Sequence, residues 1–426
     1  MSTYQNVVII GASAAGHTLA NSLVPNIPGT HRIILIDALD FGFWPCASLR
    51  GSVVPGWEKR LTAPLRTATV FKADSAHQVV APNKVVELKE SHIVLEKPFE
   101  GSKELSFSQC IIAVGALQSS PMRPEPGSTE AEYQQLLVKY QQQIGQANKI
   151  VIVGAGAVGL ELSGEIRAQY PTKSITIVNS QSSVLNPTAN PPDLNKVRST
   201  YSSPPTLPKL SAAIEKDLKA LNITLVTNEK VNIPTSPSGD AIEWDGSFGL
   251  QSSVKKVSLA SGKKLEADFV FVSTGNQPNV SIVEQADKGA IISGLIGVDE
   301  NLRIISTNKT QSPFNKNYYA IGDCCSTPGL KTAQGAFTDA AGCAVNILAE
   351  IKKTPLKAYN RPLPIGLLIP LGPNKGNGTL TVPFLGTIVV PLFMLKMIKS
   401  QKLFIDDLFL GMFQGATKVE IPPIPA

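Results

Sequence analysis

The sequence predicts an α/β fold with two parallel β-sheets, because one short unit of strand, glycine-rich turn and helix occurs twice. The first copy has an apolar strand at 7–10 and a helix expected from 14 to 23. The second has an apolar strand at 150–153 and a helix expected over 160–166. Strands that are apolar throughout are typical of parallel sheets with helices on both faces. We therefore expect two Rossmann-like dinucleotide-binding domains.

The turn between strand and helix has the pattern of a phosphate-binding loop. In the second copy Gly154 permits a tight turn, Gly156 lets a pyrophosphate approach the backbone, and Gly159 lets the helix pack on the strand. The helix N-terminus adds free N–H groups and a positive dipole. The first copy has serine at the middle glycine and reads Gly11, Ala12, Ser13, Ala14, Ala15, Gly16. A single such turn can occur without a ligand, but two favour two nucleotides and electron transfer between them.

The residue after the second strand of each unit bears on nucleotide choice. Asp37 follows the strand at 32–36, where a carboxylate accepts hydrogen bonds from ribose hydroxyls. The alternative is a solvated acid at a strand end. Asn179 follows the strand at 174–178, and its position lacks the acid that would favour NADH. NADPH, or use of both nucleotides, is therefore admissible.

Two further apolar strands, at 108–116 and 267–272, each lead to a glycine. The second strand mirrors the first, closes the second unit and returns the chain to the first unit. The candidate residues here are Ala113, Gly115 and Gly275.

A last apolar strand, at 317–321, brings Gly322 and Asp323 to the same edge. Lys331 precedes a helix expected from 332 to about 351. Its ammonium and the helix N-terminus would present positive charge to an anionic ring or oxyanion. The alternative for Lys331 is a solvated lysine at a helix start.

Composition narrows the class of protein. The 426 residues include 39 basic and 33 acidic side chains without a dense basic run, so no nucleic-acid partner is expected. The five cysteines lack CxxC spacing, which predicts a reducing compartment and no metal site. Only Cys46 stands where a disulfide reductase would carry two cysteines, so a dithiol relay is disfavoured. The chain enters a strand without a signal peptide, and we expect a cytoplasmic location.

The chain from Pro362 onward is strongly apolar, with Lys396, Lys399 and Lys402 near its end. The stretch at 381–395 is interrupted by proline and glycine and is shorter than the roughly twenty residues of a spanning helix. One interpretation is a small α/β cap packed on the other domains. The other adds an exposed apolar face that touches a membrane and admits a lipophilic substrate.

With these motifs together, the chain resembles two-dinucleotide-binding-domain flavoproteins. Within them it is most similar to apoptosis-inducing-factor-like oxidoreductases of the ferroptosis-suppressor type. The residues that carry the resemblance are Ala47 with Arg50, the run 159–165, Gly322-Asp323-Cys324 with Lys331 and Ala333, and the tail at 371–378 and 395–404. The resemblance implies an FAD unit at 1–120, an NAD(P)H unit at 121–264, a resumed FAD unit at 265–352 and a C-terminal domain at 353–426.

The resemblance also implies residue roles. The Gly11–Gly16 turn, Asp37 and Arg50 would hold the ADP half of FAD, although an exposed helical arginine is an alternative for Arg50. The backbone near Val86 would face the adenine, Asp323 the ribitol and Lys331 the isoalloxazine. Gly154, Gly156 and Gly159 would hold the NAD(P)H pyrophosphate, with Gly275 flanking the nicotinamide. Glu161 would face the nicotinamide–flavin junction; the alternative is an acid that offsets the helix dipole.

The expected function is hydride transfer from NAD(P)H to FAD, with electrons passed on to a quinone-type acceptor. Lys331 and Glu161 are the candidate catalytic residues. The alternatives are a reductase for a protein redox partner and a slow-turnover NAD(P)H-sensing signalling protein. Lipid-anchored members of the group begin with Met-Gly, whereas residue 2 here is serine, so acylation is not expected. Peripheral membrane contact through the C-terminal domain remains open.

Overall fold

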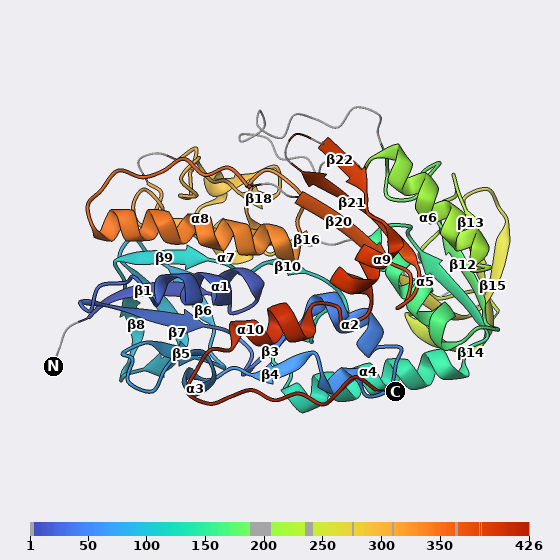
Figure 1. The fold of residues 1–426 in the computed structure, drawn as a ribbon, viewed down its shortest axis with the longest axis horizontal. Coiled ribbons are helices and arrows are strands. Elements are labelled where there is room, and N and C mark those ends of the chain that lie inside the picture. The colour runs from blue at the N-terminus through green and yellow to red at the C-terminus, as the bar shows by residue number, and fades with distance from the viewer. Residues whose placement is uncertain are drawn as a thin grey trace.

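The structure is a computed structural model that describes residues 4–187, 206–234, 242–274, 277–308, 311–362, 365–382, 384 and 386–425. Two five-stranded sheets form its two ends, and the last part of the chain lies across both (Figure 1). The expected α/β fold with two Rossmann-like domains is confirmed. Gly275 lies outside the described residues, as does 188–205 of the long surface loop that the Ser-, Pro- and Asn-rich composition of 182–208 predicts.

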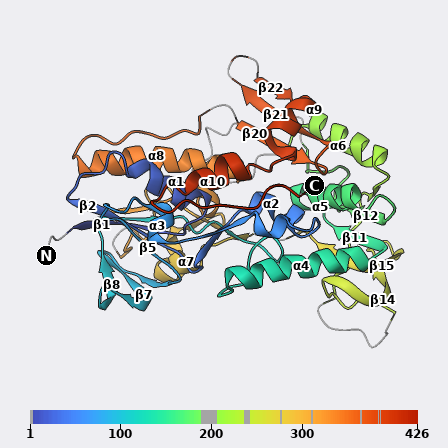
Figure 2. The ribbon, with the colours of Figure 1, turned by 60° about the horizontal axis from the view of Figure 1, so that its bottom comes forward.

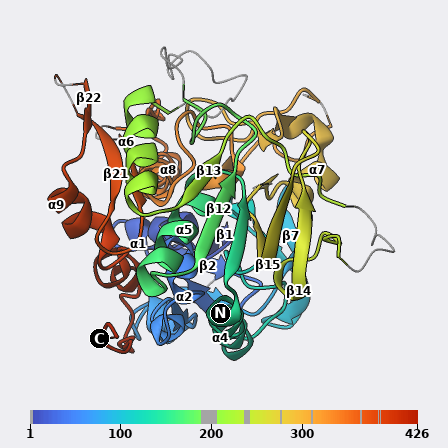
Figure 3. The same ribbon diagram turned by 90° about the vertical axis from the view of Figure 1, so that its right-hand side faces the viewer.

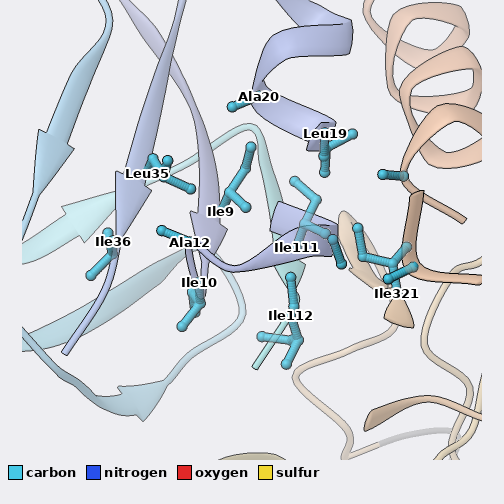
Figure 4. Packing of buried hydrophobic residues seen from close by; sticks show 14 of the residues in the cluster. Ile9, Ile10, Ala12, Leu19, Ala20, Leu35, Ile36, Ile111, Ile112 and Ile321 are labelled. Carbon is cyan, nitrogen blue, oxygen red and sulfur yellow. The ribbon is translucent and has the colours of Figure 1, made fainter. Parts of the chain in front are cut away.

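The first sheet is parallel and has the strand order β19-β9-β1-β2-β5. Its strands are β1 (Gln5–Ile10), β2 (His31–Ile36), β5 (Gln78–Val80), β9 (Gln109–Ile112) and β19 (Tyr318–Ala320). Helices α1 (Ala14–Leu23) and α8 (Ala333–Ile351) pack side by side along it. Figure 4 shows Leu19 and Ala20 of α1 beside Ile9 of β1 and Ile111 of β9. This dry contact holds the first turn of α1 at the carboxyl edge of the sheet.

The second sheet has the order β13-β12-β11-β15-β14, with only β14 antiparallel to its neighbour. Its strands are β11 (Lys149–Val153), β12 (Ser174–Val178), β13 (Thr224–Val226), β14 (Gly249–Ser258) and β15 (Lys264–Val272). Helices α4 (Glu130–Gln146), α5 (Ala157–Gln169) and α6 (Pro208–Ala220) accompany it. The expected domain boundary at 264 is wrong, because β15 pairs with β11 and the second domain continues through Val272.

The chain leaves and re-enters the first domain through two paired strands. β10 (Ala116–Leu117) runs antiparallel to β16 (Gln277–Pro278), so the two crossings form one short ribbon. The remaining elements of the first domain surround its sheet. They are β3 (Phe41–Phe43), α2 (Pro45–Gly51), η1 (Trp57–Lys59), β4 (Thr62–Pro64), α3 (Thr67–Val70), β6 (Val85–Leu88), β7 (His92–Phe99), β8 (Ser102–Ser106), α7 (Ser281–Ala286), η2 (Lys288–Ala290), β17 (Ile291–Ile292), β18 (Leu295–Ile296) and η3 (Gly322–Cys324).

The C-terminal part is a three-stranded antiparallel sheet followed by short helical turns. It contains β20 (Ile365–Pro370), β21 (Gly376–Val382), β22 (Gly386–Val389), α9 (Leu392–Leu395), η4 (Lys396–Ser400), η5 (Ile405–Phe409) and α10 (Leu410–Met412). The sheet stands beside α5 and α6 (Figure 3). A Cβ on Gly164 of α5 would lie 2.2 Å from the Leu371 backbone, so glycine is required for this contact. Among the described helices, none has the length and apolar character to cross a bilayer.

After α10 the chain runs back along the first domain, and its end lies near α2 (Figure 2). Gly415 N donates to Thr69 O, and Arg60 donates to Pro422 O. Phe413 packs edge-on against His17 of α1, with ring centroids 4.8 Å apart. His17 is completely buried, and the only polar group that acts on its ring is the Met412 backbone of the described chain. Burial lowers the pKa of His17 to about 4.

This histidine predicts acid sensitivity. Above pH 6.5 the ring is neutral in both the folded and unfolded chain and adds no pH dependence to stability. As the pH falls from 6.5 toward 4, only the unfolded chain takes up the proton, so stability is lost. Between pH 7.5 and pH 5 the His17→Leu variant should lose about 2 kcal/mol less stability than the wild type in urea titrations. His92→Gln in the β6–β7 hairpin is the control, and an equal loss in wild type and His17→Leu would contradict the prediction.

Candidate functional site

The first glycine turn joins three strand ends. Gly11 has a φ of +101°, and a Cβ there would lie 2.5 Å from Ala113 O at the end of β9. A Cβ on Gly16 would lie 1.8 Å from Gly11 O, so α1 can sit this close only with glycine at both positions. Ser13 is the N-cap residue of α1, but its side chain makes no capping hydrogen bond.

Asp37 at the end of β2 is tied directly to this turn. Its Oδ2 accepts from Ala12 N at 2.7 Å, and its Oδ1 accepts from Leu39 N at 2.9 Å. Burial raises the pKa of the Asp37 carboxyl, while the backbone donors and Arg123 oppose the shift. Each oxygen keeps a second lone pair, which is the acceptor capacity that a ribose diol requires.

Val86 lies near the same end of the sheet. Asn83 N donates to Asp37 O at 2.8 Å, which brings the start of β6 against Asp37. Val85 pairs with Leu95 and Glu87 with Val94, so Val86 is the extra residue of a β-bulge and its side chain is exposed. The adenine contact of its backbone stays a prediction.

Gly322 and Asp323 stand at the end of β19, opposite the start of α1. Gly322 has a φ of +79°, and a Cβ there would lie 3.1 Å from Ala15 Cβ. Gly322 N donates at 3.2 Å to Asp339 of α8, a fully buried acid that also pairs with Arg361 at 2.7 Å. The Oδ1 atom of Asp323 is buried and has no hydrogen-bond partner among the described residues. Such an orphan acceptor fits a hydroxyl donor supplied by a ligand.

Lys331 is anchored beside this acid. Its Nζ donates to Cys325 O at 2.5 Å and to Thr327 O at 3.0 Å. Thr332 caps α8 by accepting from Gly335 N. Burial raises the pKa of the Asp323 carboxyl, and the charges of Lys331 and Arg123 oppose that shift. The ammonium therefore lies in the electrostatic field of Asp323, as expected for a lysine at the flavin end of the site.

The second glycine turn repeats the first. Gly154 has a φ of +106°, and a Cβ on Gly159 would lie 2.1 Å from Gly154 O. A Cβ on Gly156, by contrast, would meet no atom within 4 Å, so open space remains where a pyrophosphate would approach. Ser273 Oγ donates to Val153 O and Gly154 O and holds the turn from β15. Sequence reasoning missed this serine, because its partners are backbone atoms on another strand.

Asn179 lies at the end of β12, where its side-chain amide donates to Gln181 O at 3.2 Å and Ser183 O at 2.8 Å. The amide thus shapes the loop after β12. Because Asn179 and not an acid follows β12, NADPH stays admissible beside NADH, and the choice between them stays a prediction.

Glu161 of α5 forms an ion pair with Lys399 at 2.8 Å, and both side chains are only 13% exposed. Lys399 also donates to Leu368 O of β20 at 2.9 Å. The charges of Lys399, Glu161 and Asp323 all act on the thiol of Cys46, whose pKa burial raises to about 11. The pair therefore lies within electrostatic range of Cys46 at the start of α2, as does Asp323 of the first domain. The sequence showed Lys399 only as one of three lysines, because its partner is 238 residues away.

Arg50 does not have the surroundings expected for a pyrophosphate ligand. Its guanidinium binds both carboxylate oxygens of Glu165 at 2.7–2.8 Å and donates to Ser400 O and Gln401 O. Arg50 and Glu165 are each 3% exposed, and the Trp57 ring lies 4.8 Å from the guanidinium. This correction makes Arg50 a link between α2, α5 and the C-terminal domain. Spacing along the chain could not distinguish the two roles.

All five cysteines are free, and Cys46 has no second cysteine with which to form a redox disulfide. Among the described residues no group of acids, histidines and cysteines is arranged to hold a metal ion.

Two glycine turns at the starts of α1 and α5, an orphan carboxylate and a nearly buried acid–lysine pair are the features of an oxidoreductase that carries FAD and binds NAD(P)H. Residues 5–340 match the family model for pyridine nucleotide-disulphide oxidoreductases. The chain belongs to this family.

Curated relatives cover nearly all of the chain. Ferroptosis suppressor protein 1 of Homo sapiens is 26% identical over 413 residues, 96% of each chain. Apoptosis-inducing factor homolog B of Dictyostelium discoideum is 26% identical, covering 94% of this chain and 95% of that protein.

Solved structures have the same fold. A ferredoxin reductase of Rhodopseudomonas palustris has a TM-score of 0.61 at 19% identity, covering 89% of this chain and 83% of that one. NDH2 of Plasmodium falciparum, in complex with NADH, has a TM-score of 0.63 at 14% identity, covering 98% and 100%.

The orphan oxygen predicts that Asp323 is required for FAD. The Asp323→Ala variant should purify with roughly tenfold less bound FAD than the wild type, because the buried acceptor for the ribitol is gone. Absorbance at the flavin band relative to protein measures the content. Asp74→Ala, a change of an exposed acid on the same domain, is the control. An Asp323→Ala protein of full yellow colour would contradict the assignment.

Proposed function

We propose that this protein is an FAD-dependent NAD(P)H oxidoreductase whose electron acceptor is a quinone. The observation that carries the proposal is the Glu161–Lys399 pair, in which the first turns of α5 after the second glycine turn, β20 and η4 meet. When bound, FAD supplies the two-electron chemistry by taking a hydride and passing electrons on. The protein then has to orient both nucleotides and hold a proton donor near the acceptor oxygen.

The Glu161–Lys399 pair is suited to that second task. A quinone takes up two electrons and two protons, and negative charge develops on its oxygen before the protons arrive. The Lys399 ammonium can donate a hydrogen bond to that oxygen and stabilise the charge. Glu161 keeps the ammonium in place, and burial raises the pKa of this carboxyl while Lys399 opposes the shift. Lys331 and the N-terminus of α8 add positive charge on the Asp323 side.

A disulfide acceptor is a poorer fit. Cys46 lies by the pair, but no second cysteine is near it in sequence, and burial raises the pKa of its thiol to about 11. At neutral pH the thiol stays protonated and is a weak nucleophile. A small organic acceptor needs no protein thiol, which favours the quinone.

The C-terminal domain supports a lipophilic acceptor. Phe393 is 69% exposed, Met397 is 70% exposed and Phe384 is fully exposed, with Ile388 and Leu392 also partly in solvent. Lys396 and Lys402 lie in the same segment. An apolar face with lysines beside it is the composition of an interfacial membrane contact. We infer peripheral contact with an anionic membrane surface from the cytoplasmic side, where five free cysteines persist.

The ion pair predicts a loss of turnover when either partner is neutralised. Lys399→Met and Glu161→Gln should each lower kcat for a soluble ubiquinone analogue roughly tenfold or more. Lys402→Met, which removes an exposed lysine of the same segment, should keep the wild-type rate. Anaerobic stopped-flow reduction by NADH and NADPH, followed by quinone addition, separates the two half-reactions.

Two results would favour the other functions. Rapid reduction of a ferredoxin with no turnover of quinones would indicate a reductase for a protein partner. A long-lived charge-transfer band with negligible turnover of every acceptor would indicate an NAD(P)H sensor.

The exposed apolar face predicts binding to vesicles. Replacing Phe393 and Met397 together by serine should lower the affinity for phosphatidylserine-containing vesicles in flotation roughly a hundredfold, because burying two side chains of this size in the membrane contributes about 3 kcal/mol. Phe248→Ser is the matched control, since Phe248 is 51% exposed on the second domain. Equal flotation of all three proteins, or none for the wild type, would contradict membrane contact.

A further inference from the structure

Arg123 is partly buried, and no acidic side chain of the described residues forms an ion pair with it. It follows the β10 crossing strand, and its guanidinium lies over the Phe43 ring at 5.6 Å. A Cβ on Gly115 would lie 2.9 Å from Arg123 Nη2, so the side chain rests directly on the backbone after β9. Its Nε is buried without a hydrogen bond, and within the described chain the guanidinium forms no ion pair shorter than 4.0 Å. An arginine keeps its charge under these conditions, and burying it unpaired is costly.

The surroundings identify the sign and place of the missing partner. The charges of Asp323 and Asp37 are the main ones that act on Arg123 and offset its burial. Asp37 lies at the ribose end of the expected FAD site, beside the first glycine turn, and Asp323 lies at its ribitol end. The guanidinium is therefore within electrostatic range of both acids, although it forms an ion pair with neither.

Without a cation such as the Arg123 guanidinium, the carboxylates of the expected FAD site would repel a pyrophosphate. FAD carries two negative charges on its phosphates, and the two carboxylates add two more along the same trough. The N-terminus of α1 offers only about half a positive charge. The Ser13 side chain adds no charge, and all the carboxylate contacts of Arg50 go to Glu165.

We propose that Arg123 is the cation that binds the FAD pyrophosphate, opposite the backbone N–H groups of the Gly11–Gly16 turn. A guanidinium suits this position because its planar fork can donate two hydrogen bonds to phosphate oxygens at once. Phe43 supports the plane of the group from below, and Gly115 permits its close approach. Arg123 thus takes the role that the sequence suggested for Arg50.

Titration of FAD-free protein with FAD, followed by flavin fluorescence, tests this assignment. Arg123→Gln should bind FAD roughly thirtyfold more weakly, about 2 kcal/mol. Arg123→Lys should be intermediate, because a lysine keeps the charge and loses the fork. Raising the salt concentration should weaken binding more in the wild type than in Arg123→Gln. Arg66→Gln, on an exposed arginine of the same domain, is the control and should bind as the wild type does.

The melting temperature of the FAD-free protein distinguishes cofactor binding from a structural role. Removing an unpaired buried charge should leave that temperature unchanged or raise it, while the gain on adding FAD becomes smaller. A lower melting temperature without FAD, or an FAD affinity within about twofold of wild type, would overturn the proposal. If Arg123→Gln does not fold, the affinity of Arg123→Lys decides. A wild type that binds no FAD would instead refute the flavin site itself.

Discussion

The buried pair between Arg50 and Glu165 is the interaction on which the arrangement of the domains depends. Arg50 belongs to α2 of the first domain and Glu165 to α5 of the second, and the guanidinium also holds two carbonyl groups of the C-terminal segment. Breaking a buried pair by removing one partner costs about 3–5 kcal/mol, because a charge is left unpaired. Glu161 lies one helical turn before Glu165, so the same contact that joins the domains places Lys399 beside Glu161. The candidate acceptor site is therefore a consequence of domain docking.

Positive charge is supplied separately at the flavin end and at the phosphate end of the expected FAD site. Near the flavin end, Lys331 and the capped start of α8 face the orphan oxygen of Asp323. Near the phosphates, a helix dipole and glycine backbone provide the geometry but little net charge, and the unpaired guanidinium of Arg123 supplies the remainder. Asp339 connects these regions to the last domain, since it holds Gly322 N and the Arg361 side chain together. Positive groups thus reach the site from the interdomain crossing, from α8 and from the C-terminal segment.

The sequence pattern agrees best with the structure for elements whose hydrogen bonds and packing are set by residues close together in the chain. The expected helix at 14–23 is α1, and the expected strand at 150–153 lies within β11. The β15 boundary was misplaced because a second sheet and a returning chain use the same apolar strand pattern. Lys399 and Arg123 were missed as site residues for another reason. The sequence does not show whether a lysine or arginine is buried or paired with an acid, because that depends on residues that only the tertiary structure brings next to it.

The sequence by itself determined the two glycine turns, the acids that follow or face them, and the absence of a dithiol. The turns follow from local sterics, since a Cβ at Gly16 or Gly159 would overlap the backbone of the same βα unit. The tertiary structure alone decided which charges meet. Arg50 pairs with Glu165, Lys399 pairs with Glu161, and Arg123 lies within electrostatic range of Asp37 and Asp323. Charges interact according to their distance in space, and these partners lie far apart in the chain.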